Sequence, residues 1–168
     1  MHTDSLDRFE TSLEAVGVGL TRTVVSDFPD IVTELVDEPA VGTSLGFDGL
    51  TLDSTPVKTT ITPRDLEKAN TGVTPIAHAI AEYGTLVVES SAAGNEPVAL
   101  YPPKHVGVVR ESDVLTDVTE AIPHLGERFS DGGSAVFATG VSATGDMGAL
   151  VEGVHGPKTV HVVLVEGL

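Results

Sequence analysis

The sequence contains no cysteine among its 168 residues. Without thiols this chain can form no disulfide, build no zinc ribbon and ligate no iron–sulfur cluster through cysteine. The absence also fits a reducing cytosol, where disulfides are rare. Candidate chemistry has to come from hydroxyl, imidazole, carboxylate and amine groups.

Long apolar runs are also missing. No run approaches the roughly 18 residues that a membrane-spanning helix needs. The first residues, MHTDSLDRFE, are polar and acidic and lack the basic and apolar regions of a signal peptide. These absences predict a soluble, cytoplasmic protein with no membrane insertion.

Basic residues are scarce. Nine lysines and arginines stand against 25 aspartates and glutamates, so the formal net charge is −16 at pH 7. A hydrophobic fraction of 40% argues against a disordered acidic tail. The scattered acids of this acidic protein predict a halophilic, salt-rich cytosol, because salt screens their mutual repulsion. The charge also argues against nucleic acid as a partner, since phosphate contacts need a basic face.

Three motifs that often mark catalytic sites are absent. Gly140 and Gly145 have the G-x-x-x-x-G spacing of a phosphate-binding loop, but Asp146 follows where that loop has lysine. The sequence has no G-x-S-x-G nucleophile elbow and no H-E-x-x-H zinc motif. It therefore names no cofactor and no metal site.

Helical signals occur along the whole chain. Apolar residues at three- and four-residue steps predict helices over 6–16 and 28–35. Thr62-Pro63 and Thr74-Pro75 each suit an N-cap followed by proline, and the second would open a helix over 76–83 that Gly84 ends. A further amphipathic helix is predicted over 112–122, and its inward-facing residues would be Val114, Leu115, Val118 and Ile122.

Extended patterns alternate with these helices. Runs rich in Val, Leu and Ile predict strands, with one or two in the fourth of the following segments: 20–26, 39–46, 85–90, 97–110, 134–140 and 158–166. Near-continuous apolar runs suit a sheet that is covered on both faces. The sequence therefore predicts one α/β domain with a mostly parallel sheet.

The first candidate site lies in the segment TGVSATGDMGALVEGVHGPKTVHVVLVE, residues 139–166. Gly140, Ser142 and Thr144 follow a predicted strand, and ligands of open α/β sheets bind where strands end. Their backbone N–H and hydroxyl groups could contact a ligand. Asp146 either belongs to this site or only caps a short helix over 146–153.

A second candidate lies in GVHGPK, residues 153–158. His155 stands between two glycines and before a proline, on a constrained turn that enters the last strand. It could move a proton, donate to a substrate or simply cap a carbonyl group. Gly156 and Lys158 belong to the same turn.

The third candidate is the turn that begins at Glu82. At the end of a predicted helix its charge would oppose the helix dipole, which indicates either a function or an ordinary exposed acid. Gly84 and Thr85 follow directly and would form the start of the next strand. Thr85 could bind a ligand or satisfy the turn.

The order of these stretches resembles that of a known family. AEYGTLVVES, LYPPKHVGVV, TGVSATGDM and GVHGPKTVHVVLVE follow one another as in the lactate-utilisation protein C family (LutC/YkgG), whose module is the LUD domain. The resemblance covers about residues 70–166 and is strongest over 139–166. It implies a single LUD domain over 1–168 with a Rossmann-like sheet, similar to the CoA-transferase and sugar-phosphate isomerase (NagB/RpiA) folds.

The resemblance also implies a function. The chain would be a subunit or accessory protein of an L-lactate oxidation system that acts with iron–sulfur partner proteins, and a small carboxylate would be its ligand. A stand-alone small-molecule enzyme of the CoA-transferase or isomerase type and a non-catalytic assembly module are the alternatives. In the first case Glu82 would be the nucleophile or base.

Two positions depart from the family's loop, which usually reads G-P-S-R-T-A-D-I-E. Ala143 replaces the arginine and Gly148 replaces the glutamate. The change at 143 removes a group that could clamp a carboxylate through paired hydrogen bonds. The acid–base candidates are Glu82 and His155. The expected ligand contacts are Gly84, Thr85, Gly140, Ser142, Thr144, Asp146, Gly156 and Lys158.

Overall fold

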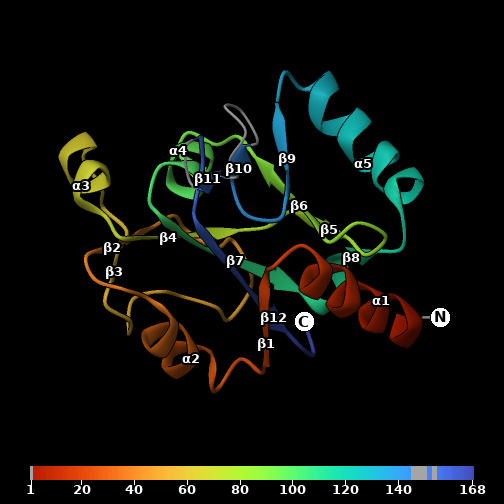
Figure 1. Cartoon of the computed structure of the whole chain (residues 1–168), viewed down its shortest axis with the longest axis horizontal. Helices are drawn as coiled ribbons and strands as arrows, with labels where there is room; N and C mark the ends of the chain where they lie inside the picture. Colours follow the sequence, from red (N-terminus) through yellow and green to blue (C-terminus); the bar gives the residue numbers. More distant parts are fainter. Residues whose placement is uncertain (1, 145–150, 153–154) are drawn as a thin grey trace.

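A computed structural model of the chain describes residues 2–144, 151–152 and 155–168, and Figure 1 shows its elements. The helical elements are α1 (His2–Ala15), α2 (Phe28–Leu35), α3 (Pro63–Lys68), α4 (Asn95–Leu100), the 3₁₀ turn η1 (Glu111–Asp113) and α5 (Val118–Ser130). The strands are β1 (Gly19–Thr23), β2 (Ala40–Gly42), β3 (Val57–Lys58), β4 (Thr71–Pro75), β5 (His78–Ile80), β6 (Thr85–Glu89), β7 (Lys104–Arg110), β8 (Val114–Leu115), β9 (Ala135–Thr139), β10 (Ala143–Thr144), β11 (Val151–Glu152) and β12 (Thr159–Val165).

Six parallel strands form the central sheet, in the order β1-β12-β7-β4-β2-β3. Successive side chains of a strand point to opposite faces. Val162 of β12 packs on the face that α1 covers, and Val163 packs on the face that α2 covers. The valine-rich runs of β7 and β12 arise because both faces are buried. The prediction of an α/β fold with a mostly parallel sheet is confirmed.

A second sheet, which the sequence did not predict, packs over the α1 face of the first. Its order is β8-β5-β6-β9, and β6 runs antiparallel to both of its neighbours. Leu86 and Val88 face the central sheet, whereas Val87 faces α5. The second sheet therefore lies between the central sheet and α5, as Figure 1 shows.

Several predicted elements are present. Leu6, Phe9 and Leu13 of α1 are buried, as the helical spacing required. The Thr62 hydroxyl accepts a hydrogen bond from the Asp65 backbone N–H, and the Asp65 carboxylate accepts one from the Thr62 N–H. This reciprocal pair caps α3 where the Thr-Pro signal placed its start.

The helix predicted over 76–83 is wrong. Thr74 and Pro75 end β4, and 78–80 form β5, which pairs with both β6 and β8. A threonine followed by proline suits an N-cap, yet here strand pairing with distant segments outweighs that local preference. Glu82 consequently lies in a turn between two strands and opposes no helix dipole.

The segment 97–110, for which one or two strands were predicted, supplies one, β7, because 95–100 form α4. The helix predicted over 112–122 is wrong at its start. In the amphipathic segment, Val114 and Leu115 form β8, and Asp117 caps α5 through the N–H groups of the next turn. Because α5 begins at Val118, the face that carries Ala121 and Leu125 is buried, and Val118 and Ile122 are exposed. The periodic pattern was therefore assigned to the wrong helical face.

The short helix predicted over 146–153 is wrong at its end, where β11 pairs antiparallel with β10. Residues 146–150 and 153 of that prediction lie outside the described residues. Among the helices that the structure describes, none has both the length and the apolar character needed to cross a lipid bilayer.

Candidate functional site

A cavity of about 300 Å³ lies between the second sheet and the central sheet. Its lining residues come from β6, α4, β7, β9, β12 and the loops on either side of 143–154. The cavity lies at the carboxyl end of β9, since Thr139 and Gly140 line it. The central sheet, however, contributes His105 and Val160, which lie near the amino ends of β7 and β12.

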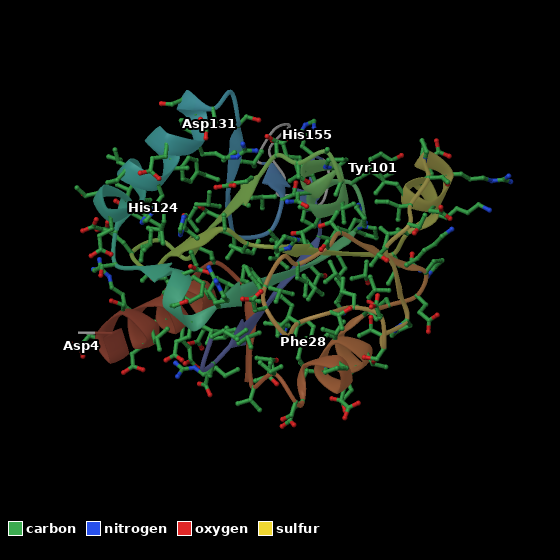
Figure 2. All side chains as sticks on the ribbon, turned by 180° about the vertical axis from the view of Figure 1, so that it is seen from behind. Asp4, Phe28, Tyr101, His124, Asp131 and His155 are labelled. Atoms are coloured by element: carbon green, nitrogen blue, oxygen red, sulfur yellow. The ribbon has the colours of Figure 1, made fainter. Side chains whose placement is uncertain are left out.

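Two of the three predicted clusters meet at the mouth of this cavity, which we define by Ser142, His155 and Gly156. The Ser142 N–H donates to the Pro157 carbonyl over 2.9 Å, and the His155 N–H donates to the Ser142 hydroxyl oxygen over 3.3 Å. All three mouth residues line the cavity. Figure 2 shows His155 on the same side of the molecule as Tyr101, which directly follows α4.

Close packing at Gly156 and Gly140 holds the mouth in this form. A Cβ added at Gly156 would lie 3.2 Å from the Ser142 Cβ. Gly140 has a φ of +76° and lies against Val16, so a side chain there would be strained. Both glycines are therefore required by the backbone conformation at the mouth, and both line the cavity.

Glu82 lies away from the cavity lining. Its carboxylate forms an ion pair with Arg8 of α1 over 3.3 Å, and its backbone carbonyl accepts from the Ser12 hydroxyl at the same distance. Gly84, with a φ of +66°, packs against the backbone of Ser12 and Leu13. This turn therefore seats α1 on the second sheet.

The other predicted contacts have different surroundings. Thr85 is buried and its hydroxyl lies 2.7 Å from that of Thr139, which lines the cavity, so Thr85 supports the wall from behind. Lys158 is exposed, and its N–H donates to the Pro103 carbonyl over 2.8 Å. Thr144 belongs to β10, and its side chain, like the whole of Asp146, lies outside the described residues.

Sequence reasoning missed His105, which forms the floor of the cavity. Its side chain is 2% exposed, and Nε2 lies 2.9 Å from the Thr74 hydroxyl oxygen. Burial lowers the pKa of His105 from 6.5 to about 4, so the ring is neutral near pH 7. The only sequence signal was a polar residue inside the apolar run of β7.

The two half-buried histidines, His161 and His78, have structural partners. His161 shares a hydrogen bond of 2.8 Å with Thr21 of the neighbouring strand. His78 of β5 stacks on His124 of α5 with ring centroids 4.5 Å apart. Burial lowers the pKa of both His78 and His161, and the nearby His124 lowers that of His78 further.

The cavity is neutral and largely apolar. Its lining, as far as the structure describes it, contains no lysine, arginine, aspartate or glutamate. Polar groups come from Thr139 and Ser142 and from the two imidazoles. No group of three or more His, Asp or Glu within the described ranges could hold a metal ion. The arrangement can bind through hydrogen bonds, and His155 is its solvent-exposed imidazole.

Comparisons with known proteins agree with this architecture. A family model described as the LUD domain matches residues 47–165. Lactate utilization protein C from Deinococcus radiodurans is 28% identical over 172 residues, a match that covers 95% of this chain and 79% of that protein. The protein of that name from Bacillus licheniformis is 34% identical over 105 residues, which cover 60% of this chain and only 44% of that protein.

A solved structure has the same fold. The crystal structure of a DUF162 family protein from Deinococcus radiodurans matches with a TM-score of 0.76 at 22% identity. The match covers 98% of each chain. Because the identity is low, this likeness establishes the architecture alone.

Proposed function

The chain belongs to the LUD domain family, and from that premise we propose that it is a subunit or accessory protein of an L-lactate oxidation system. The relatives named lactate utilization protein C support this role. Oxidation of lactate to pyruvate releases electrons, and a chain without cysteine has no thiolate ligands for a cluster that would accept them. The proposal therefore includes iron–sulfur partner proteins as the acceptors.

The observation that carries the role of the site is the junction of Ser142 and His155 at the mouth of the cavity. The His155 backbone N–H donates to the Ser142 hydroxyl oxygen, although the two residues lie 13 positions apart. A small carboxylate at this mouth would meet a hydroxyl and an imidazole while its charge stays close to water. Lys158, exposed on the same turn, is the nearest lysine in sequence. We therefore propose the mouth as the carboxylate-binding end.

A non-catalytic assembly module is the second candidate. It is favoured by Ala143, which stands where the family usually has arginine, and by the absence of cations from the described cavity lining. The stand-alone enzyme with Glu82 as nucleophile has less support. Glu82 is paired with Arg8 and lies outside that lining.

The proposal predicts a defined loss of lactate oxidation. The tagged protein, purified from its native host at molar salt, should bring iron–sulfur proteins with it, and a strain lacking the chain should lose lactate-dependent dye reduction. Ser142→Ala and His155→Ala should each lower this activity by about tenfold or more, because each removes a polar contact at the mouth. Glu34→Ala on the exposed side of α2 is the matched control.

Each alternative gives a different outcome. Unchanged lactate oxidation in the deletion strain would refute the role. Loss of the complex in the deletion strain with full activity of both mouth variants would favour the assembly module. Glu82→Gln should change the activity by less than about twofold, since surface ion pairs contribute little; a large loss would favour the stand-alone enzyme.

A further inference from the structure

We propose that His105 determines which ligands the cavity accepts, by donating a hydrogen bond to an uncharged carbonyl oxygen at the inner end of the ligand. The ligand class is thus a small molecule with a ketone, amide or ester group at the end that enters first. Only its outer, carboxylate end rests on the proposed function.

The position of His105 suits this role. The ring is 2% exposed, yet it lines the cavity. Val88, Ala99 and Val160 line the cavity as well. A polar group in such surroundings needs a partner, because a buried donor without one costs on the order of 1–3 kcal/mol. The ligand can provide that partner.

The hydrogen bond to Thr74 indicates which ring nitrogen is left to donate to a ligand. Thr74 is fully buried, and its hydroxyl has the His105 Nε2 as its side-chain partner. If the hydroxyl donates to Nε2, its proton is satisfied and Nδ1 carries the ring proton. If Nε2 donated instead, the buried hydroxyl proton would lack this acceptor. The first tautomer is therefore favoured, and it leaves an Nδ1–H that no described residue accepts.

The inner end selects against charge. The neutral imidazole can donate a hydrogen bond but supplies no positive charge, and the described lining has no lysine or arginine to do so. A carboxylate pushed to the floor would lose its hydration without gaining a cation, which is strongly unfavourable. A ketone or amide oxygen accepts the same hydrogen bond at a much smaller desolvation cost. The cavity, at about 300 Å³, leaves room for a body of several carbon atoms.

Three probes that share a propanoate tail test the inner end directly. Levulinate ends in a methyl ketone, isocaproate replaces the ketone oxygen by a methyl group, and succinate replaces the ketone by a second carboxylate. Binding to the full chain at molar salt is measured by calorimetry or ligand-observed NMR. Levulinate should bind about fivefold more tightly than isocaproate, the worth of a typical hydrogen bond. Succinate should bind at least about tenfold more weakly than levulinate.

Variants identify the residue responsible. His105→Phe should abolish the preference for levulinate over isocaproate, because phenyl has no N–H donor. His161→Phe makes the same replacement on neighbouring β12, outside the cavity lining, and should leave the preference unchanged. If His105→Phe does not fold, Thr74→Val tests the same contact, since it removes the hydroxyl that selects the tautomer and should weaken the preference. A preference that survives His105→Phe, or one that Thr74→Val leaves at full strength, would overturn the proposal.

The outcomes separate this inference from the proposed function. Equal binding of levulinate and isocaproate, or tightest binding of succinate, would refute the role of His105 and leave the lactate role intact. Failure of all three probes to bind would overturn both the inner and the carboxylate end of the site. Nitrogen-15 NMR of the wild-type ring should show Nδ1 protonated and shifted by levulinate, and the opposite tautomer would contradict the donor role.

Discussion

Replacing Gly72 by alanine is expected to lower the free energy of unfolding by about 3 kcal/mol, at the upper end of what overpacking costs. Gly72 lies in β4, where α4 crosses the central sheet. A Cβ at this position would collide with the carbonyl oxygen of Val98 and come within 2.9 Å of its carbonyl carbon. Backbone atoms cannot rotate away as a side chain can, so α4 would have to move.

The expected displacement of α4 should also change ligand binding in the cavity. Ala99 and Leu100 of α4 line the cavity, so lifting α4 should also weaken levulinate binding. Urea unfolding at fixed molar salt measures the stability change. Gly126→Ala is the matched control, because nothing lies within 4 Å of a Cβ there and alanine should raise helix stability by up to about 1 kcal/mol. Equal stability of Gly72→Ala and wild type would show that α4 does not approach β4 this closely.

Acid should destabilise the protein through His105. In the unfolded chain its pKa is near 6.5, whereas burial holds it at about 4 in the folded protein. Below pH 6.5 the unfolded state therefore binds a proton that the folded state does not bind. The free energy of unfolding decreases as the pH is lowered, until the folded pKa is reached. Between about pH 7.5 and pH 4 this single group should remove about 3 kcal/mol.

A difference measurement isolates that contribution from the many carboxylates. The free energy of unfolding of wild type and His105→Phe is measured by urea titration across this pH range. The variant should gain on wild type by about 2 kcal/mol on going from pH 7.5 to about pH 5. Val106→Ala, a buried neighbour on β7 that does not titrate, should lower stability equally at each pH. A pH-independent difference between wild type and His105→Phe would contradict the neutral, buried ring.

Most strands could be predicted because their apolar runs are local and unambiguous. The run over 85–90 became β6, and the run over 158–166 became β12. Nothing in such a run says which sheet it joins. β6 and β12 read alike in sequence, yet β12 lies inside the central parallel sheet and β6 inside the smaller mixed one. The hydrophobic pattern therefore could not predict that the strands form two sheets.

Some residues of the candidate site could likewise be predicted from the sequence, and others could not. Ser142 and His155 were suspected from hydroxyl, glycine and histidine content, and the fold joins them at the cavity. Glu82 was suspected because of a helix that does not form, and it pairs with Arg8 instead. His105 carried no spacing signal, since its partner Thr74 lies 31 positions away on another strand. Only strand pairing brings these two side chains together.

By itself the sequence determined what depends on composition and near neighbours. It excluded cysteine chemistry, set the acidic charge, placed the α3 cap at Thr62 and marked the buried strands, because these properties need no knowledge of distant residues. The tertiary structure decided which segments pair, which face of α5 is buried and which side chains surround the cavity. Those outcomes depend on contacts between residues far apart in the chain, where the burial of a whole sheet outweighs the preference of any single turn.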